Sequence, residues 1–254
     1  MHVTSRLKMV AFLDTYAADA RGKTVLDVGS RVANKGKYSY RNATDAKGMV
    51  YTGLDMEAGE NVDIVPANPS LWSEIADEQF DYVISGQAFE HAPFPWITFA
   101  EVARVLKPGG RTFLIAPSSG HVHRFPYDCW RYYPDSWASL CALTGLVLTE
   151  SIREGLETED VPGSQWIDSA AVITKEPFAS PETRADFYQN LKEIVAPFAT
   201  RQYNVQPAIL NEGACYRSYL ALAKSHAVRG PKEVKDWRVN EARRANERLR
   251  RTTA

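Results

Sequence analysis

Cysteine is scarce in this 254-residue chain, which contains only Cys129, Cys141 and Cys215. Three cysteines so widely scattered are too few for a disulfide framework, and their separations match no metal-ligand spacing. We therefore expect small buried or inert thiols. The sequence predicts no metal site.

The chain also lacks an excess of charge of either sign. It has 30 lysine and arginine residues against 31 aspartate and glutamate residues, a formal net charge of −1. The isoelectric point is near 6.5. A chain with this balance has no general electrostatic attraction to nucleic acid or to anionic membranes. We therefore expect no nucleic-acid partner.

Long apolar runs are missing as well, because no stretch approaches the roughly 18 apolar residues that a membrane span requires. Residues 1–6 contain no apolar segment typical of an export signal. The sequence therefore predicts no membrane span, and we expect a cytoplasmic location. The length suits one large domain, or one domain with an appendage.

Short apolar runs alternate with helical patterns through the first two thirds of the chain. Such runs, bounded by glycine, proline or acidic residues, are typical of buried parallel strands. The predicted strands are 24–28, 49–54, 62–65, 80–84, 111–115 and 146–149. Apolar residues at helical spacing predict helices at 5–18, 96–106 and 135–143.

This alternation predicts an α/β fold with a Rossmann-like, doubly wound, mostly parallel sheet of seven strands. The seventh is a closing antiparallel edge strand at 168–174, for which 215–223 is the alternative. Helical patterns follow, so we divide the chain into a domain at 1–176, which includes the N-terminal helix, and a mainly helical extension at 177–254. The charged stretch 232–254 is either a solvated or dimer-forming helix, or a basic arm for an acidic partner.

Two positions at the carboxyl ends of the first two strands suit a ligand that contains a ribose. Ligands of such sheets bind beyond these strand ends, where the strand order reverses. Gly29 would let the backbone turn sharply close to a ligand. The carboxylate of Asp55 can accept hydrogen bonds from both ribose hydroxyls. Each position alone is also typical of a turn or a solvated acid, but together they indicate a binding site.

Four motifs in register resemble the class I S-adenosylmethionine-dependent methyltransferases of the type 11 kind. Residues 25–30 resemble the glycine-rich first motif of that family, and residues 51–55 its ribose-binding acidic motif. Residues 80–91 are similar to the fourth-strand motif, which includes a Glu-His pair, and residues 106–110 match its Leu-Lys-Pro-Gly-Gly turn. The resemblance covers about residues 20–150.

The resemblance implies S-adenosylmethionine as the cofactor. The implied cofactor-binding residues lie in or after the first four strands: Asp27, Gly29, Ser30, Arg31, Asp55, Met56, Asn68, Gly86 and Gln87. The sequence departs from the family pattern where later glycines of the first motif are replaced by Arg31 and Ala33, so we expect Arg31 or Lys35 near the cofactor carboxylate. Asn68 stands where the family often has an acid that contacts the adenine. A nicotinamide enzyme is disfavoured, because the full Gly-x-Gly-x-x-Gly run is absent.

The loop at 117–134 gathers two histidines, an acid, two arginines and five aromatic residues. It is similar to the His-x-x-Pro-x-Asp-x-Trp-Arg stretch of methyltransferases found with glycan-modifying enzymes, which indicates the acceptor side of a site. His123 is the expected general base, because a hydroxyl is a poor nucleophile while it is protonated. Asp128 would orient His123 or bind acceptor hydroxyls, and His91 is the second choice of base.

Trp130 and Tyr132 are expected to stack on a flat ligand face. The alternative interpretation of this loop is structural, with an ion pair between Asp128 and Arg131 and with the rings in the core. Loop acids could also hold Mg²⁺, but no ligand spacing requires a metal.

The sequence therefore predicts a methyltransferase that modifies a small molecule or a glycan, on oxygen and with a histidine base. The alternatives are N-methylation of a small molecule or peptide, and a non-catalytic scaffold that binds S-adenosylmethionine. The motifs do not fix the acceptor, because this scaffold serves many chemistries.

Overall fold

The computed structural model describes most of the first 200 residues and a few later ones. The described residues are 3–32, 38–153, 167–200, 203, 205, 214–215 and 217–218. The chain divides into two compact units, Met1–Val205 and Gln206–Ala254. Most of the competing stretch 215–223 and all of 232–254 lie outside the described residues, and the domain division at 176 and 177 stays a prediction. None of the helices described is long and apolar enough to cross a membrane.

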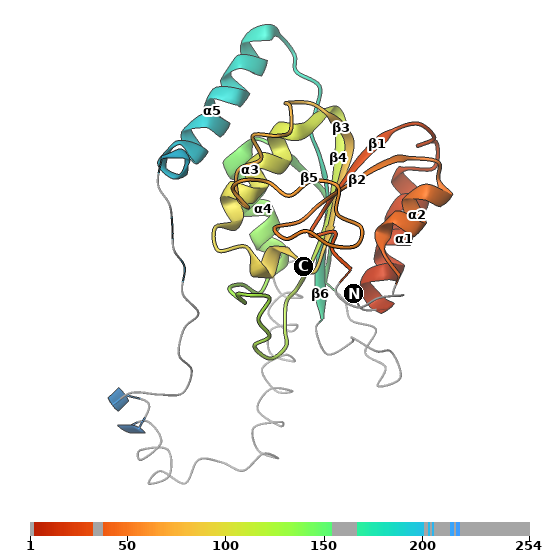
Figure 1. Cartoon of the computed structure of the whole chain (residues 1–254). Coiled ribbons are helices and arrows are strands. Elements are labelled where there is room, and N and C mark those ends of the chain that lie inside the picture. Colours follow the sequence, from red (N-terminus) through yellow and green to blue (C-terminus); the bar gives the residue numbers. More distant parts are fainter. Residues whose placement is uncertain are drawn as a thin grey trace, which may run out of the picture. The chain divides into compact units, whose positions relative to one another are not determined.

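Strands and helices alternate along the first unit (Figure 1). The elements are α1 (Val3–Tyr16), β1 (Thr24–Val28), α2 (Tyr40–Ala46), β2 (Val50–Leu54), β3 (Phe80–Gly86), the short 3-10 helix η1 (Phe89–His91), α3 (Pro95–Val105), β4 (Leu106–Pro117), α4 (Pro134–Thr144), β5 (Val147–Arg153), β6 (Asp168–Thr174) and α5 (Pro181–Ala199). Helices α1, α3 and α4 lie where their apolar spacing predicts them, and α5 lies in the stretch after residue 176 that has helical patterns. Helix α2 was not predicted.

The strands form one sheet in the order β2-β1-β3-β4-β6-β5. The strands β2, β1, β3 and β4 run parallel to one another. Strand β6 pairs antiparallel with both β4 and β5. The chain runs from β1 out to β2 and then returns to the other side of β1 as β3, so the strand order reverses between β1 and β3. The α/β class and the mostly parallel sheet are confirmed.

The expected count of seven strands is wrong for the described residues, where the sheet has six. The predicted strand at 62–65 forms only an isolated parallel bridge between Leu54 and Ile64. Its backbone cannot extend a ladder, because the amides of Asp63 and Ile64 both donate to the carbonyl of Gly53. Val65 is 47% exposed, so this stretch also lacks the burial of a parallel strand.

The expected edge position of the antiparallel strand is also wrong. β6 lies inside the sheet, between β4 and β5, and every one of its residues is buried. The small and apolar residues of β6 suit a strand covered on both faces. β5 is the edge strand, and its polar, largely exposed residues suit that place.

Two apolar clusters cover the two faces of the sheet. Leu26 and Val28 of β1 pack on the side of α3 and α4, and Val25 packs on the side of α1. Phe12 of α1 stacks on Phe113 of β4 with ring centroids 4.7 Å apart. The alternation of β1 side chains between two helical layers (Figure 1) explains why this strand is a continuous apolar run.

Asp168 joins three elements at the carboxyl end of β4. It is 1% exposed, and its Oδ2 accepts hydrogen bonds from the hydroxyls of Thr4 (3.1 Å) and Ser5 (3.0 Å) on α1. Its Oδ1 accepts a hydrogen bond from Nε2 of Gln87, which follows β3, at 3.0 Å. This buried carboxylate therefore holds the start of α1 against the sheet beside the end of β3.

We expect Asp168→Ala to lower the free energy of unfolding by about 3 kcal/mol, because it leaves buried donors without their charged acceptor. Asp14→Ala is the matched control on α1, since Asp14 is 62% exposed and pairs only at the surface with Lys47. The control is expected to change stability by less than about 0.5 kcal/mol. Urea unfolding measures both variants, and equal losses would contradict the role of Asp168.

Candidate active site

The segments after β1 and β2 meet at the point where the strand order reverses. The backbone amides of Gly29 and Ser30 donate to the carbonyl oxygen of Leu54, at 2.8 and 3.1 Å. The amide of Arg31 donates to Oδ2 of Asp55 at 3.1 Å. The structure therefore places Gly29 and Asp55 side by side, as the sequence predicts for residues that hold one ligand.

Gly29 adopts a φ of +82°, a conformation that side-chain-bearing residues rarely take. A Cβ at this position would overlap the Cβ of Ala88, which lies two residues beyond β3. A glycine is therefore needed at this position because two protein loops touch there. It would also let a ligand come close to the backbone. This contact brings the loop after β1 against the segment that leads into η1.

A buried polar network lies behind this loop. The hydroxyl of Tyr51 donates to Oδ2 of Asp27 at 2.6 Å, and Nδ2 of Asn61 donates to the Tyr51 hydroxyl at 2.8 Å. Ser30 exchanges hydrogen bonds with Asn61, through its hydroxyl and its carbonyl oxygen. Burial raises the pKa of Asp27 to about 7, although the Tyr51 hydrogen bond acts in the opposite direction. Asp27 and Ser30 therefore support the loop from inside the protein.

The other cofactor candidates after the first two strands lie apart from this network. The guanidinium of Arg31 pairs with Glu57 at 3.0 Å. Met56 is 40% exposed next to Asp55. Asn68 lies in a turn of its own, where its side chain accepts from the amide of Ser70, and no hydrogen bond described joins it to Gly29 or Asp55. Lys35 lies outside the described residues.

Gly86 and Gln87 form the end of β3. A Cβ on Gly86 would overlap the hydroxyl of Tyr40 on α2, and this buried hydroxyl has no hydrogen-bond partner among the described residues. The side chain of Gln87 is held by Ser5 and Asp168. Gly86 therefore leaves room for Tyr40, whose unsatisfied hydroxyl suits a polar ligand group, whereas the Gln87 side chain is engaged in the fold.

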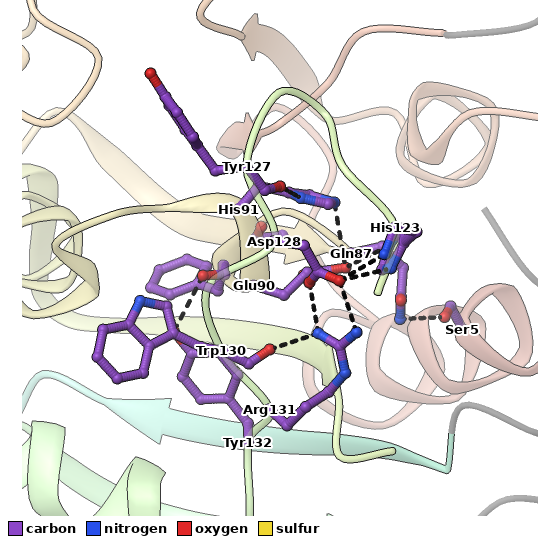
Figure 2. A network of polar contacts seen from close by, with 12 residues as sticks. Ser5, Gln87, Glu90, His91, His123, Tyr127, Asp128, Trp130, Arg131 and Tyr132 are labelled. Atoms are coloured by element: carbon purple, nitrogen blue, oxygen red, sulfur yellow. Dashed lines mark hydrogen bonds and ion pairs between the residues drawn. The ribbon is translucent and has the colours of Figure 1, made fainter. Parts of the chain in front are cut away.

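Glu90 lies at the centre of the predicted acceptor side (Figure 2). Its side chain is fully buried, and burial raises its pKa to about 8. Its Oε1 lies 3.7 Å from Nε2 of His91 and 4.0 Å from Nε2 of His123. The backbone carbonyl of Glu90 accepts from the amides of Cys129 and Trp130, which fastens the loop after β4 to η1.

Asp128 holds His123 and Arg131 together, as Figure 2 shows. Its Oδ2 accepts from the backbone amide of His123 at 2.7 Å and lies 3.3 Å from Nδ1 of the same ring. The guanidinium of Arg131 donates to both carboxylate oxygens, at 2.5 and 2.8 Å. Burial alone would raise the pKa of Asp128, but the hydrogen bonds from Arg131 and His123 outweigh it and lower the pKa to about 2. Asp128 thus forms the ion pair with Arg131 that the structural interpretation predicts, and it also lies beside His123 as the catalytic interpretation predicts.

His91 lies next to His123, with ring centroids 5.0 Å apart. Its Nδ1 is 2.5 Å from the carbonyl oxygen of Tyr127. Burial lowers the pKa of His91, which favours the neutral ring. The three predicted catalytic residues, His91, His123 and Asp128, are therefore brought into one cluster.

Sequence reasoning missed Glu90 as a site residue, although the Glu-His pair in the fourth-strand motif was a signal for it. Tyr132 is a second correction, because it is 3% exposed and stacks on Trp137 with centroids 4.6 Å apart. It is a core residue and offers no face to a ligand. Trp130 is 40% exposed, and its indole nitrogen donates to the carbonyl of Ala92. Phe125, at 62% exposed, is the other accessible ring near the two histidines.

Residues 30–114 match a family model described as a methyltransferase domain. This stretch contains the Asp55 position, the end of β3 and the Glu-His pair. This part of the chain is therefore similar to methyltransferase domains, whose methyl donor is S-adenosylmethionine.

Named relatives are also similar to part of this chain. An uncharacterized methyltransferase of Mycobacterium ulcerans is 29% identical over 133 residues, 46% of this chain and 50% of the relative. One of Mycobacterium tuberculosis is 30% identical over 125 residues, 43% of this chain and 47% of the relative. This chain thus spans about half the length of the curated relatives that it matches.

Solved structures share the fold of the methyltransferase domain. A chain from the Haloferax volcanii complex between the Trm112 methyltransferase activator and a methyltransferase has a TM-score of 0.54 at 20% identity, covering 70% of this chain and 91% of that one. The 1,6-didemethyltoxoflavin-N1-methyltransferase of Burkholderia thailandensis has a TM-score of 0.52 at 16% identity, covering 70% and 80%. At these identities the likeness establishes the fold alone.

The residues present fit S-adenosylmethionine. Each oxygen of Asp55 accepts one backbone amide, from Arg31 or Glu57, and each retains a lone pair for a ribose hydroxyl. The buried, unsatisfied hydroxyl of Tyr40 is available to the polar amino-acid end of the donor. Asp55 and Tyr40 therefore offer hydrogen-bonding groups to a nucleoside and to a polar ligand group around the same strand ends.

We expect Gly29→Ala to weaken S-adenosylmethionine binding by about tenfold or more, roughly 1.4 kcal/mol, because the added methyl would displace the loop from Ala88. Gly22→Ala is the matched control. Gly22 also has a positive φ, +75°, but a Cβ there meets nothing within 4 Å. Both variants carry backbone strain, and only Gly29→Ala should lose affinity in calorimetry. An unchanged affinity for Gly29→Ala would contradict the role of this contact.

Proposed function

We propose that this chain is an S-adenosylmethionine-dependent methyltransferase that acts on a hydroxyl group of a small molecule or a glycan. The observation that carries the proposal is the contact between Gly29 and Ala88. It brings the loop beside Asp55 against Ala88, which is two residues before Glu90 and three before His91. A donor held at Asp55 would therefore lie next to a cluster of proton-accepting side chains. The donor is a metabolite of the cell interior, which supports the expected cytoplasmic location.

The donor supplies an electrophilic methyl group on a sulfonium. In transfer to oxygen, the bond between the acceptor oxygen and the methyl carbon forms as the carbon–sulfur bond breaks, and the acceptor hydroxyl loses its proton. We assign that proton to Nε2 of His123. The contact with Asp128 favours the tautomer with the proton on Nδ1, which leaves Nε2 as the acceptor. Asp128 also stabilises the ring once it is protonated.

The surroundings of the cluster favour a polar acceptor with an apolar face. Glu90 and His123 supply polar groups, and the exposed ring of Phe125 lies against both histidines. The partly exposed ring of Trp130 belongs to the same loop and contacts Trp96. Aromatic faces beside polar groups suit the stacking of a sugar or another flat ring. The N1-methyltransferase of B. thailandensis shows that the fold also serves nitrogen acceptors, but a histidine paired with a carboxylate matches the proton removal that an alcohol requires.

Calorimetry with S-adenosylmethionine, followed by a methyl-transfer screen against sugars, phenols and amines, tests the function. We expect binding that Asp55→Ala weakens by about tenfold or more, since it removes the ribose acceptor. Asp45→Ala, at an exposed acid of α2, is the control and should leave affinity unchanged. Turnover with hydroxyl substrates is expected. Binding without turnover of any acceptor would favour a non-catalytic scaffold, and turnover of amines alone would favour N-methylation.

The base assignment predicts that His123→Ala lowers kcat by about 100-fold or more, because general-base catalysis contributes that much. The affinity for S-adenosylmethionine should stay within about twofold, since the ring lies on the acceptor side. His121→Ala is the matched control in the same loop. Steady-state kinetics and calorimetry measure the two quantities. Equal losses in turnover and donor affinity, or no loss, would reject His123 as the base.

A further inference from the structure

Three side-chain atoms that accept hydrogen bonds converge beside η1. They are a carboxylate oxygen of Glu90 and one ring nitrogen each of His91 and His123, and all three lie within 4.8 Å of one another. Nε2 of His91 and Nε2 of His123 are the ring nitrogens that lie near Oε1 of Glu90. Glu90 is fully buried, and neither of its carboxylate oxygens has a hydrogen-bond partner among the described residues. A buried polar group without a partner costs free energy. The carboxyl group of Glu90 therefore lacks the partner that its burial calls for, and a bound cation would supply one.

In both histidines the Nδ1 atom, which lies on the side of the ring away from Glu90, faces an acceptor oxygen. Nδ1 of His91 lies 2.5 Å from the carbonyl oxygen of Tyr127, and Nδ1 of His123 lies 3.3 Å from Oδ2 of Asp128. The contact with Tyr127 places the ring proton of His91 on Nδ1, and the nearby carboxylate of Asp128 favours the same tautomer of His123. In these tautomers the lone pair of each ring is on the Nε2 that faces Glu90. Histidines that bind metals are held in the same way, by a carbonyl or carboxylate on the second nitrogen.

The distances between the three side chains suit ligands of a metal ion better than partners in a hydrogen bond. The separations of 3.7 and 4.0 Å between Glu90 Oε1 and the two Nε2 atoms are too long for a hydrogen bond. Ligand atoms at ~2.1 Å from a tetrahedral Zn²⁺ are themselves about 3.4 Å apart. A small inward movement of the rings would therefore bring all three atoms to bonding distance of one ion.

We propose that Glu90, His91 and His123 form a binding site for a divalent transition-metal ion of the Zn²⁺ type. Two imidazoles and one carboxylate suit Zn²⁺, whereas Mg²⁺ prefers oxygen ligands alone. Three protein ligands leave a coordination position open, as in catalytic zinc sites. Asp128, anchored by Arg131, is the positioning residue that fixes the ring of His123.

The site does not depend on the proposed methyl transfer, but it bears on it. Nε2 of His123 has a single lone pair, so it either binds the ion or accepts the acceptor's proton. With the ion bound, an acceptor hydroxyl at the open position would be acidified directly, because metal coordination lowers the pKa of a bound oxygen. The same three residues would then activate the acceptor by coordination instead of by a histidine base.

Titration of Zn²⁺ into the full-length chain, after dialysis against a chelator, tests the site. We expect one ion per chain by calorimetry, and visible absorption bands of a four-coordinate site when Co²⁺ replaces Zn²⁺. Glu90→Gln, which keeps the shape of the side chain, and His91→Ala should each weaken Zn²⁺ binding by about 100-fold or more. Mg²⁺ should bind far more weakly than Zn²⁺.

Cys129→Ser is the matched control, because Cys129 is an exposed thiol in the same loop and the commonest source of a false zinc signal. It should leave Zn²⁺ affinity unchanged. Circular dichroism and S-adenosylmethionine affinity report whether each variant is folded. Failure of Zn²⁺ to bind a folded chain, or binding that survives in Glu90→Gln and is lost in Cys129→Ser, would overturn the site. A chain that binds the methyl donor but no Zn²⁺ contradicts this inference alone, and one that binds Zn²⁺ but no donor contradicts the proposed function alone.

Discussion

The close contact between Gly29 and Ala88 is the constraint on which the rest of the site depends. It exists because β1 and β3 are parallel neighbours, so the segments that leave their carboxyl ends must pass each other. A glycine with positive φ allows that passage without a side chain between the two loops. One contact thereby connects the loop beside Asp55 with the Glu90 and His91 pair. The proposed donor and acceptor sides are adjacent for that reason.

Burial of Glu90 is the second organising feature. A carboxyl group shielded from water is stable only with partners, and the histidines that face it approach without forming hydrogen bonds to its oxygens. Beside it, Asp128 accepts hydrogen bonds from the guanidinium of Arg131 and from the backbone amide of His123. The unsatisfied group thus lies in the centre of an ordered shell. Unsatisfied groups in such surroundings are more typical of a binding site than of a packing error.

Much of the fold follows from local sequence, and the departures have physical causes. The strand at 24–28 and the helix at 96–106 could be predicted because their apolar spacing is strong over several residues. The stretch 62–65 has the apolar character of a strand. Two of its backbone amides donate to the same carbonyl oxygen, that of Gly53, so the strand ladder ends there. Tyr132 belongs to an aromatic loop, yet stacking on Trp137 draws it into the core. Both outcomes are decided by neighbours distant in the chain.

The sequence alone determined the fold class, the place of Asp55 and Gly29 at adjacent strand ends, and the loop that contains His123 and Asp128. These depend on the period of apolar residues and on short motifs, which are local properties of the chain. Only the tertiary structure decided that Glu90 is buried between two histidines, since residues 90, 91 and 123 become neighbours when η1 and the loop after β4 pack together. Burial and the distances between remote side chains are set by packing, and no spacing along the chain records them.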